Sequence, residues 1–259
     1  MVTMSQSEWS KYRDLLKKLS DTAADEFRDA VYKETGRWGG VGLSKIPREE
    51  ILDYAYALVT KYGEGASAAA CEWYDAIAEL SNVVVDPAEP AELPDFHEIA
   101  KAVNGAMKSG NADVVAGAIG RQVKMAGQDT TLNNAIRDGA QVGWITAGDT
   151  CAFCVTLASR GFETASKNMV KHGHAKHIHA NCDCFYAVRF DDDTEYEGYN
   201  PEEFRRLYDA APGDDAKEKI NAIRREFYKE NSEEINAQKR SAYEKRQERE
   251  SSAAEEIVV

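Results

Sequence analysis

The sequence has 259 residues, of which 43% are hydrophobic and 30% charged, and its formal net charge is −13 at pH 7. These values are typical of a soluble globular protein with room for one large or two modest domains. They exclude a membrane-spanning protein, since no apolar run approaches the length of a span. They also weigh against a dedicated DNA-binding protein, which would normally be basic, although a local basic patch is still allowed.

The N-terminal region, residues 1–82, is expected to be helical. Apolar residues recur at three- and four-residue steps from residue 8 to residue 35, which is the period of an amphipathic helix, and Ser7 is the expected N-cap. A glycine-rich turn precedes a second helix that begins at Pro47. Further glycines are expected to interrupt that helix before a third helix over residues 66–80. We expect these apolar faces to pack on the core of the protein itself.

Residues 83–97 predict a proline-rich linker, because three of the six prolines of the chain lie in the run VVVDPAEPAELP. Proline restricts its own backbone and that of the preceding residue, so the run should be extended. We place a domain boundary or a crossover connection here. After it, residues 98–190 should contain a helical lead-in followed by a Cys/His module. Residues 191–259 should contain an acidic turn and charged helices.

Three helices are expected in the lead-in, over residues 98–107, 113–125 and 129–144, and a strand is expected after Cys184, where FYAVRF alternates. The acidic run that follows lacks the glycine of a calcium-binding loop, which favours a solvated turn. From residue 216 to about residue 251 the sequence predicts one long, highly charged helix.

The most informative stretch runs from Trp144 to Phe190, because it holds four of the five cysteines and four of the five histidines. A C-x-x-C pair is followed, after a polar connector, by an H-x-x-C-x-C group. Thiolates and imidazoles at this spacing suit a tetrahedral zinc ion. Two cysteines that are two residues apart on a strand face the same way. The candidate ligands for four coordination positions are therefore Cys151, Cys154, His179, Cys182 and Cys184.

Two other interpretations of the cysteines remain open at this point. Four cysteines could form two disulfides in an oxidising compartment, or they could be free thiols in a core. The first residues have no signal-peptide character, so we expect synthesis in the cytoplasm, where thiols stay reduced. That expectation favours metal. The predicted fold class is mainly α, with a small α+β Cys/His module of the zinc type and a long charged C-terminal helix.

The ordered set W-x-T-A-G-D-T-C-x-F-C, L-A-S-R-G and H-x-N-C-x-C resembles the Mu F-like minor head proteins of tailed bacteriophages, most closely those of actinobacterial phages and prophages. The resemblance covers about Asp138 to Val188. This chain departs from the H-P-N-C-R-C of that family at Ala180 and Asp183. An aspartate in place of the arginine would remove any contact that the arginine makes with DNA or portal protein.

The resemblance implies a minor capsid or head morphogenesis protein at the portal vertex, with a structural role in head assembly and a further role in DNA packaging or ejection. The implied partners are the portal protein, the major capsid protein and phage DNA. The implied location is the bacterial host cytoplasm during assembly and then the virion head. The alternatives are a capsid maturation protease and a zinc-supported nuclease. Since G-x-S-x-G and H-E-x-x-H are both missing, we expect a non-enzymatic role.

Overall fold

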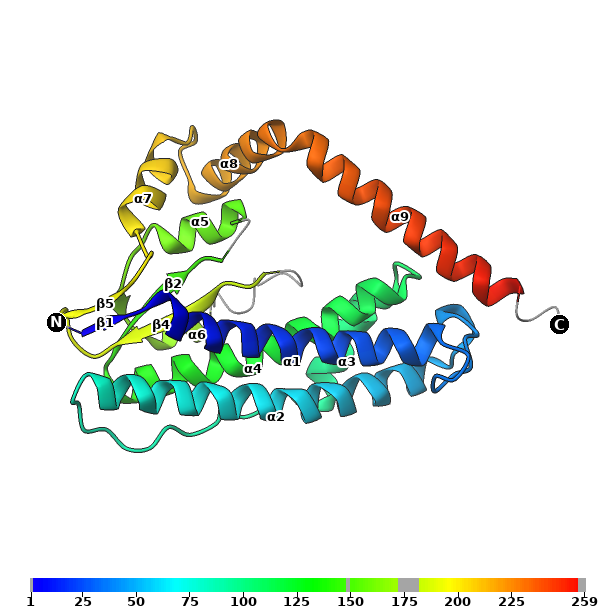
Figure 1. The fold of residues 1–259 in the computed structure, drawn as a ribbon, viewed down its shortest axis with the longest axis horizontal. Helices are drawn as coiled ribbons and strands as arrows, with labels where there is room; N and C mark the ends of the chain where they lie inside the picture. Colours follow the sequence, from blue (N-terminus) through cyan, green and yellow to red (C-terminus); the bar gives the residue numbers. More distant parts are fainter. Residues whose placement is uncertain (1, 148–149, 172–181, 256–259) are drawn as a thin grey trace.

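In the computed structural model, which describes residues 2–147, 150–171 and 182–255, long helices form one layer and two small sheets lie at one end of it (Figure 1). The helices of the described residues are α1 (Gln6–Tyr32), the 3-10 turn η1 (Leu43–Lys45), α2 (Arg48–Leu80), α3 (Phe96–Met107), α4 (Ala112–Asp138), α5 (Ala152–Ala158), α6 (Lys167–Lys171), α7 (Pro201–Ala210), α8 (Ala216–Glu230) and α9 (Ser232–Glu255). The strands are β1 (Val2–Met4), β2 (Gln141–Ile145), β3 (Glu163–Thr164), β4 (Phe185–Arg189) and β5 (Thr194–Tyr196). The chain is thus mainly helical, as the sequence predicts.

Helix α1 begins earlier than predicted, because Ser5 and not Ser7 is its N-cap. The Ser5 hydroxyl accepts the backbone N–H of Glu8 at 3.3 Å, and the Glu8 carboxylate accepts the backbone N–H of Ser5 at 2.9 Å. This reciprocal capping box satisfies two backbone donors that the first turn leaves without helical partners. Strand β1 ends one residue before the cap, so the helix starts where the sheet pairing stops.

The predicted second and third helices are one continuous helix, α2, and the expected break at Gly63 and Gly65 is wrong. The two glycines serve close packing instead. A Cβ at Gly63 would lie 3.2 Å from Leu93 Cδ2, and one at Gly65 would lie 3.4 Å from Leu19 Cδ2. The helical hydrogen bonds therefore continue through positions where neighbouring segments approach the backbone closely.

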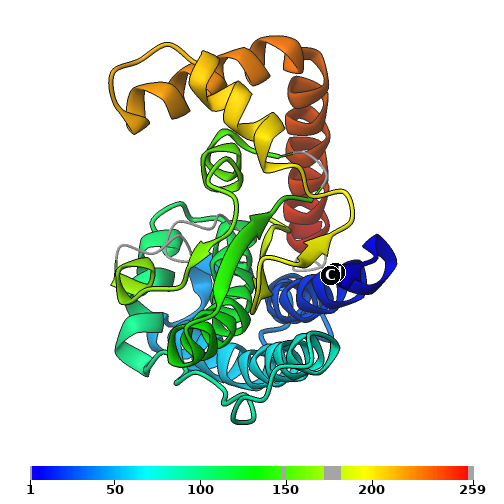
Figure 2. The same ribbon diagram turned by 90° about the vertical axis from the view of Figure 1, so that its left-hand side faces the viewer.

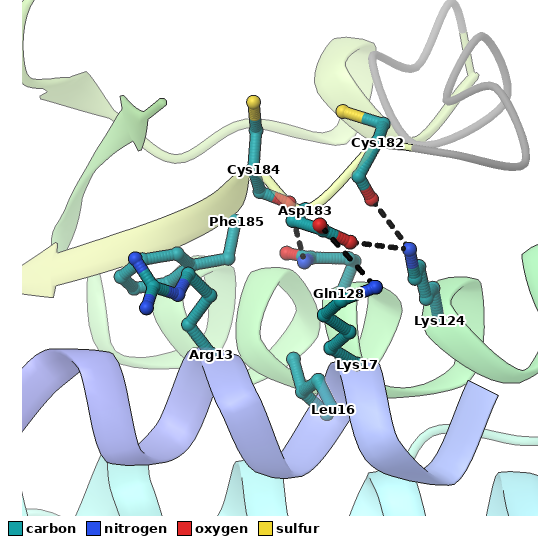
Figure 3. Close-up of a pocket in the computed structure, with 9 residues that line it drawn as sticks. All are labelled: Arg13, Leu16, Lys17, Lys124, Gln128, Cys182, Asp183, Cys184 and Phe185. Carbon is teal, nitrogen blue, oxygen red and sulfur yellow. Dashed lines mark hydrogen bonds and ion pairs between the residues drawn. The ribbon is translucent and has the colours of Figure 1, made fainter. Parts of the chain in front are cut away.

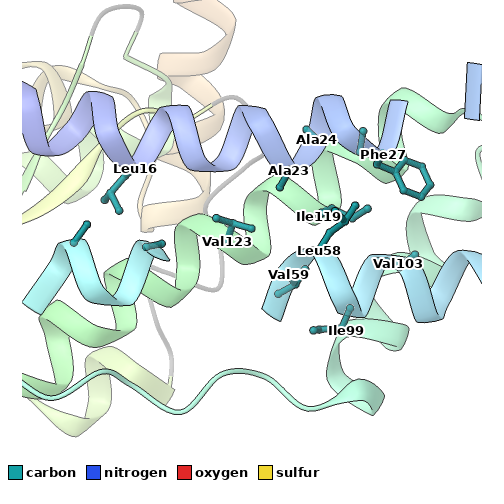
Figure 4. Close-up of a cluster of buried hydrophobic side chains, with 14 of the residues drawn as sticks. Leu16, Ala23, Ala24, Phe27, Leu58, Val59, Ile99, Val103, Ile119 and Val123 are labelled. Atoms are coloured by element: carbon teal, nitrogen blue, oxygen red, sulfur yellow. The ribbon is translucent and has the colours of Figure 1, made fainter. Parts of the chain in front are cut away.

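The main hydrophobic core lies between α1, α2, α3 and α4, whose side chains meet as Figure 4 shows. Phe27 of α1, Val59 of α2 and Ile119 of α4 are fully buried there. Burial of each such side chain stabilises the fold by about 1.5–3 kcal/mol relative to exposure. Small residues let the helices approach one another, most clearly Gly120 of α4, which faces α1.

The proline-rich segment, residues 83–94, contains no helix or strand and leads from α2 to the N-cap of α3 at Asp95. Its backbone is tied to α2 and α4 by three side chains: Asp75 accepts from the N–H of Ala88, Asn134 from that of Glu89, and Thr130 from that of Ala91. The helices before and after the segment contribute to the same core. The division of the chain into domains at this segment stays a prediction.

Helix α4 replaces the two helices expected over residues 113–125 and 129–144, and the end of the second prediction is wrong because Trp144 lies in strand β2. Gly139, with φ of +67°, ends α4 in the left-handed conformation that glycine adopts without strain. The backbone N–H groups of Gly139 and Ala140 both bond the carbonyl of Ala135. The chain then turns directly into the sheet.

Strands β3, β2 and β4 form an antiparallel sheet in that order, and β1 pairs in parallel with β5. The strand expected after Cys184 is confirmed as β4. Side chains occupy the edge of β4 that β2 leaves open. Gln128 Oε1 accepts the N–H of Tyr186 at 2.9 Å, and the Tyr196 hydroxyl donates to the carbonyl of Val188 at 2.6 Å and accepts its N–H at 3.2 Å. These bonds satisfy backbone groups that an edge strand would otherwise leave unpaired.

The charged C-terminal region is two helices, α8 and α9, in place of the single helix that the sequence predicts. The Asn231 side chain donates to the carbonyl of Phe227 at 3.1 Å, and the Ser232 hydroxyl donates to that of Lys229 at 3.4 Å. Such local side-chain bonds to backbone carbonyls are typical of asparagine and serine at helix ends, and they lie here where α8 stops and α9 starts. Helices α7 and α8 pack on α5, on the side away from the long helices (Figure 2). No helix in the described part of the chain is long and apolar enough to cross a membrane.

We expect Gly120→Val to lower the free energy of unfolding by about 1–3 kcal/mol, as overpacking usually does. A Cβ at Gly120 would lie 2.9 Å from the hydroxyl and 3.0 Å from the carbonyl oxygen of Ser20. Urea denaturation measures the change. The matched control is Gly105→Val in α3, where a Cβ would meet nothing within 4 Å. We expect a change of at most about 0.5 kcal/mol there, and equal losses in the two variants would contradict the packing role of Gly120.

We expect Tyr196→Phe to lower the free energy of unfolding by about 1–3 kcal/mol, because it leaves both backbone groups of the buried Val188 without their phenol partner. Thermal or urea denaturation measures the loss. Tyr243→Phe is the control, since that side chain is 63% exposed on α9. A Tyr196→Phe protein as stable as the control would show that the phenol does not stabilise β4.

Candidate metal centre

The first cysteine pair lies at the N-terminus of α5. Cys151 is the N-cap of this helix, and its sulfur accepts the backbone N–H of Cys154 at 3.4 Å. An N-cap side chain folds back over the first helical turn to reach that donor. The C-x-x-C spacing therefore places the Cys151 sulfur beside the residue that carries the second sulfur of the pair.

The second pair, Cys182 and Cys184, immediately precedes β4. Residues two apart on an extended chain face the same side. Figure 3 shows both sulfurs pointing away from α1 and α4, while the carbonyl of Cys182 and the carboxylate of Asp183 point toward Lys124. The segment thus presents sulfur on one side and polar backbone on the other.

The two pairs meet. Sγ of Cys154 lies 3.4 Å from Sγ of Cys182, and the sulfurs of Cys154, Cys182 and Cys184 all lie within 4.8 Å of one another. Sulfurs around a tetrahedral zinc ion, with Zn–S distances of about 2.3 Å, are about 3.8 Å apart. The three side chains are buried. This cluster could hold a metal ion, and its sulfur donors suit a soft or borderline ion.

Of the five predicted ligands, the structure brings three into one group and places a fourth beside it. The Cys151 thiol is hydrogen-bonded to that of Cys154 but is not in the group of three. His179 lies outside the described residues. All five cysteines of the chain are free thiols, so neither disulfide of the alternative interpretation is present.

The clustering disfavours thiolates as long as no cation is present. Hydrogen bonds with Cys151, Cys182 and Cys184, followed by burial, raise the pKa of the Cys154 thiol far above its usual range. For Cys184 the hydrogen bond with Cys154 acts to lower the pKa, but the bond with Cys182 and burial outweigh it, so the net pKa is raised. Buried neutral thiols of this kind are poor nucleophiles, since the thiolate is the reactive form.

Backbone donors already point at two of the sulfurs. Cys151 accepts the N–H of Cys154, and a backbone hydrogen bond from Ala147 acts to lower the pKa of Cys184. Hydrogen bonds from backbone N–H groups to sulfur stabilise metal-bound thiolates and fix their direction. The donor set, its spacing and these hydrogen bonds together fit a metal ion.

The residues on the other side of the cysteine segment come from α1 and α4, and sequence reasoning missed them. Lys124 Nζ donates to the carbonyl of Cys182 at 2.7 Å and to Asp183 Oδ1 at 2.9 Å. Lys17 Nζ lies 3.5 Å from Asp183 Oδ2. One signal was present in the sequence: Lys124 is the one charged residue in the run VKMAG, residues 123–127. Lysine is rarely buried without a partner, so a lysine within an apolar run indicates a buried partner.

Asp183 is one of the two departures from the resembled family pattern. Its carboxylate is engaged inside the protein, by Lys124 and Lys17, and its side chain is only 28% exposed. An aspartate at this position therefore links the cysteine segment to α1 and α4.

Comparison with known proteins gives one match: the family model described as VG15 protein matches residues 3–211, which includes both cysteine pairs. No curated protein and no solved structure matches the chain. VG15 is a viral protein family, which supports a phage protein, whereas the narrower Mu F-like resemblance stays a prediction. Because the match covers most of its length, the chain belongs to the VG15 protein family.

Proposed function

We propose that this chain is a minor head protein of a tailed bacteriophage, with a structural role in head assembly near the portal vertex. The single observation that carries the proposal is the match to a viral family over residues 3–211. The ordered motifs around the two cysteine pairs resemble those of Mu F-like minor head proteins. They narrow the proposal from a phage protein in general to a minor head protein. The portal protein and the major capsid protein are the proposed partners, and phage DNA is a further one. The proposed location is the host cytoplasm during assembly and then the head.

The proposal includes one structural zinc ion, which would be held by Cys151, Cys154, Cys182 and Cys184. His179 would be the alternative fourth ligand in place of Cys151. Zinc suits the donors because four thiolates, or three thiolates and an imidazole, complete a closed tetrahedral site. Bound there, it would join the start of α5 to the start of β4. Its binding free energy would then add to the folding free energy of a region with a small core.

A structural role fits the site better than a catalytic one. A catalytic zinc needs an open position for water or substrate, and a catalytic cysteine needs an accessible thiolate. Here the sulfurs of the cluster are buried, and the pKa of Cys154 and of Cys184 is raised. These properties support neither the protease nor the nuclease alternative. The net charge of −13 gives no support to a nuclease either, because nucleic-acid affinity depends on neutralising phosphates.

We expect the purified chain to contain about one zinc ion per molecule, as one four-ligand site requires. Elemental analysis together with thiol titration measures this ratio. Cys154→Ser should remove the metal and lower the melting temperature, because it deletes the sulfur at the centre of the cluster. Cys71→Ser is the matched control, since Cys71 lies on α2 outside the cluster, and it should leave the metal content unchanged.

His179→Ala decides the ligand set. Full metal content in this variant, with loss in Cys151→Ser, would establish four sulfurs, and the opposite pattern would establish three sulfurs and an imidazole. A metal-free wild-type protein with all five thiols reactive would exclude the zinc site.

We expect the protein to be found in purified virions in a fixed ratio to the portal protein, because a portal-vertex component is present in a number set by the symmetry of that vertex. Quantitative mass spectrometry of virions measures the ratio, and co-purification from cells that express both proteins tests direct contact. Absence of the protein from both virions and assembling heads would contradict the head-protein proposal. Specific cleavage of the major capsid protein or of DNA, lost in Cys154→Ser, would favour an enzyme.

A further inference from the structure

Two side chains of α4 hold the backbone of the segment that carries Cys182 and Cys184. Lys124 Nζ donates to the carbonyl oxygen of Cys182 at 2.7 Å, and Gln128 Nε2 donates to that of Cys184 at 3.4 Å. The same Gln128 amide accepts the N–H of Tyr186 at 2.9 Å. Because Lys124 and Gln128 are four residues apart, they lie one above the other on one face of the helix and can reach successive points of the extended segment.

Neither side chain approaches the sulfurs. Figure 3 shows the sulfurs of Cys182 and Cys184 on the side of the segment opposite to α4, with Lys124 and Gln128 below it. Any effect of these two residues on a metal ion must therefore pass through the backbone that they hold. Groups that orient a ligand without touching the metal typically change metal affinity by about 10–100-fold when they are replaced.

Lys124 is buried although it is charged, and its role in holding the cysteine segment explains why. Its side chain is only 6% exposed, and removing an ammonium group from water costs free energy that an apolar side chain of similar volume would not incur. The contacts of Lys124 with the carbonyl of Cys182 and the carboxylate of Asp183 offset that cost. Without the ammonium, both acceptors would lose this partner beside the metal ligands.

We propose that Lys124, assisted by Gln128, is a positioning residue of the metal centre. It fixes the direction in which Cys182 and Cys184 present their sulfurs, and so it sets the affinity of the site for a thiophilic divalent cation. This inference rests on the proposed function, since it requires that the cysteines bind a metal.

Lys17 provides the matched control. It also pairs with Asp183, at 3.5 Å, but its side chain is 45% exposed and it bonds Asp21 at 2.8 Å. Among its hydrogen bonds and ion pairs in the described part of the chain, none is to a cysteine backbone. Lys17→Met and Lys124→Met therefore remove the same charge next to the same carboxylate, and only the second removes the support of a ligand residue.

The experiment measures the dissociation constant for Zn²⁺ by competition with a chromophoric chelator, and the visible spectrum of the Co²⁺ form, in the full-length protein. Lys124→Met should weaken Zn²⁺ binding by about 10–100-fold and alter the Co²⁺ spectrum, while Lys17→Met should change affinity by less than about 3-fold. Gln128→Met keeps the approximate volume of the side chain but removes both the donor to Cys184 and the acceptor for Tyr186. It should also weaken binding.

The outcomes separate the two proposals. Wild-type protein that binds no Zn²⁺ would overturn the metal site itself. Wild-type protein that binds Zn²⁺, with Lys124→Met of equal affinity and unchanged spectrum, would overturn the positioning role alone, even if the metal-free variant melted at a lower temperature. If Lys124→Met does not fold, Gln128→Met decides, and wild-type affinity in that variant counts against the inference.

Discussion

The contact between the sulfurs of Cys154 and Cys182, 3.4 Å apart, brings together two segments that are 28 residues apart in the chain. One sulfur belongs to the first turn of α5 and the other to the residue that leads into β4. Neutral thiols contribute little attraction of their own, and their packing raises the pKa of Cys154. A cation that accepts the thiolates would add its binding free energy to the packing that joins the two segments. Helix α5 also contacts β2, α7 and α8, so the cluster is one of several contacts that position it.

The sequence predicted the cluster because the relevant spacings are local. An N-cap cysteine three residues before another, and two cysteines two apart on a strand, each place their sulfurs together whatever the rest of the fold does. The convergence of the two pairs was inferred from the preference of zinc for four ligands, and the group of three sulfurs agrees with it. The support from Lys124 and Gln128 was not predictable in the same way. It depends on α4 passing beneath the segment, which is a tertiary arrangement.

The helices show the same difference between local patterns, which the sequence reports, and tertiary contacts, which it does not. Their existence follows from apolar periodicity, but their ends depend on contacts that local patterns do not report. Gly63 and Gly65 look like a break, yet α2 continues through them because Leu93 and Leu19 fill the space that side chains would occupy. Conversely, Asn231 looks like an ordinary helical residue within a charged run, yet it is the C-cap of α8, and both its backbone N–H and its side chain donate to the carbonyl of Phe227. A residue type has only a preference for or against helix, and packing and hydrogen bonding in the fold decide whether the helix continues there.

The C-terminal helices α8 and α9 lie outside the family match, but they connect to the cysteine cluster through α5. The family match ends at Ala211, immediately after α7, so α8 and α9 lie outside it. Helix α8 attaches to the body through a small cluster in which Ile223 packs on Ala152 and Val155 of α5. Since α5 begins at the cysteine cluster and carries the residues on which Ile223 packs, a shift of Cys151 and Cys154 would reach the base of α8 through α5. Helix α9, in which no residue of described burial is buried, follows α8 and so extends from the part of the chain that packs on α5.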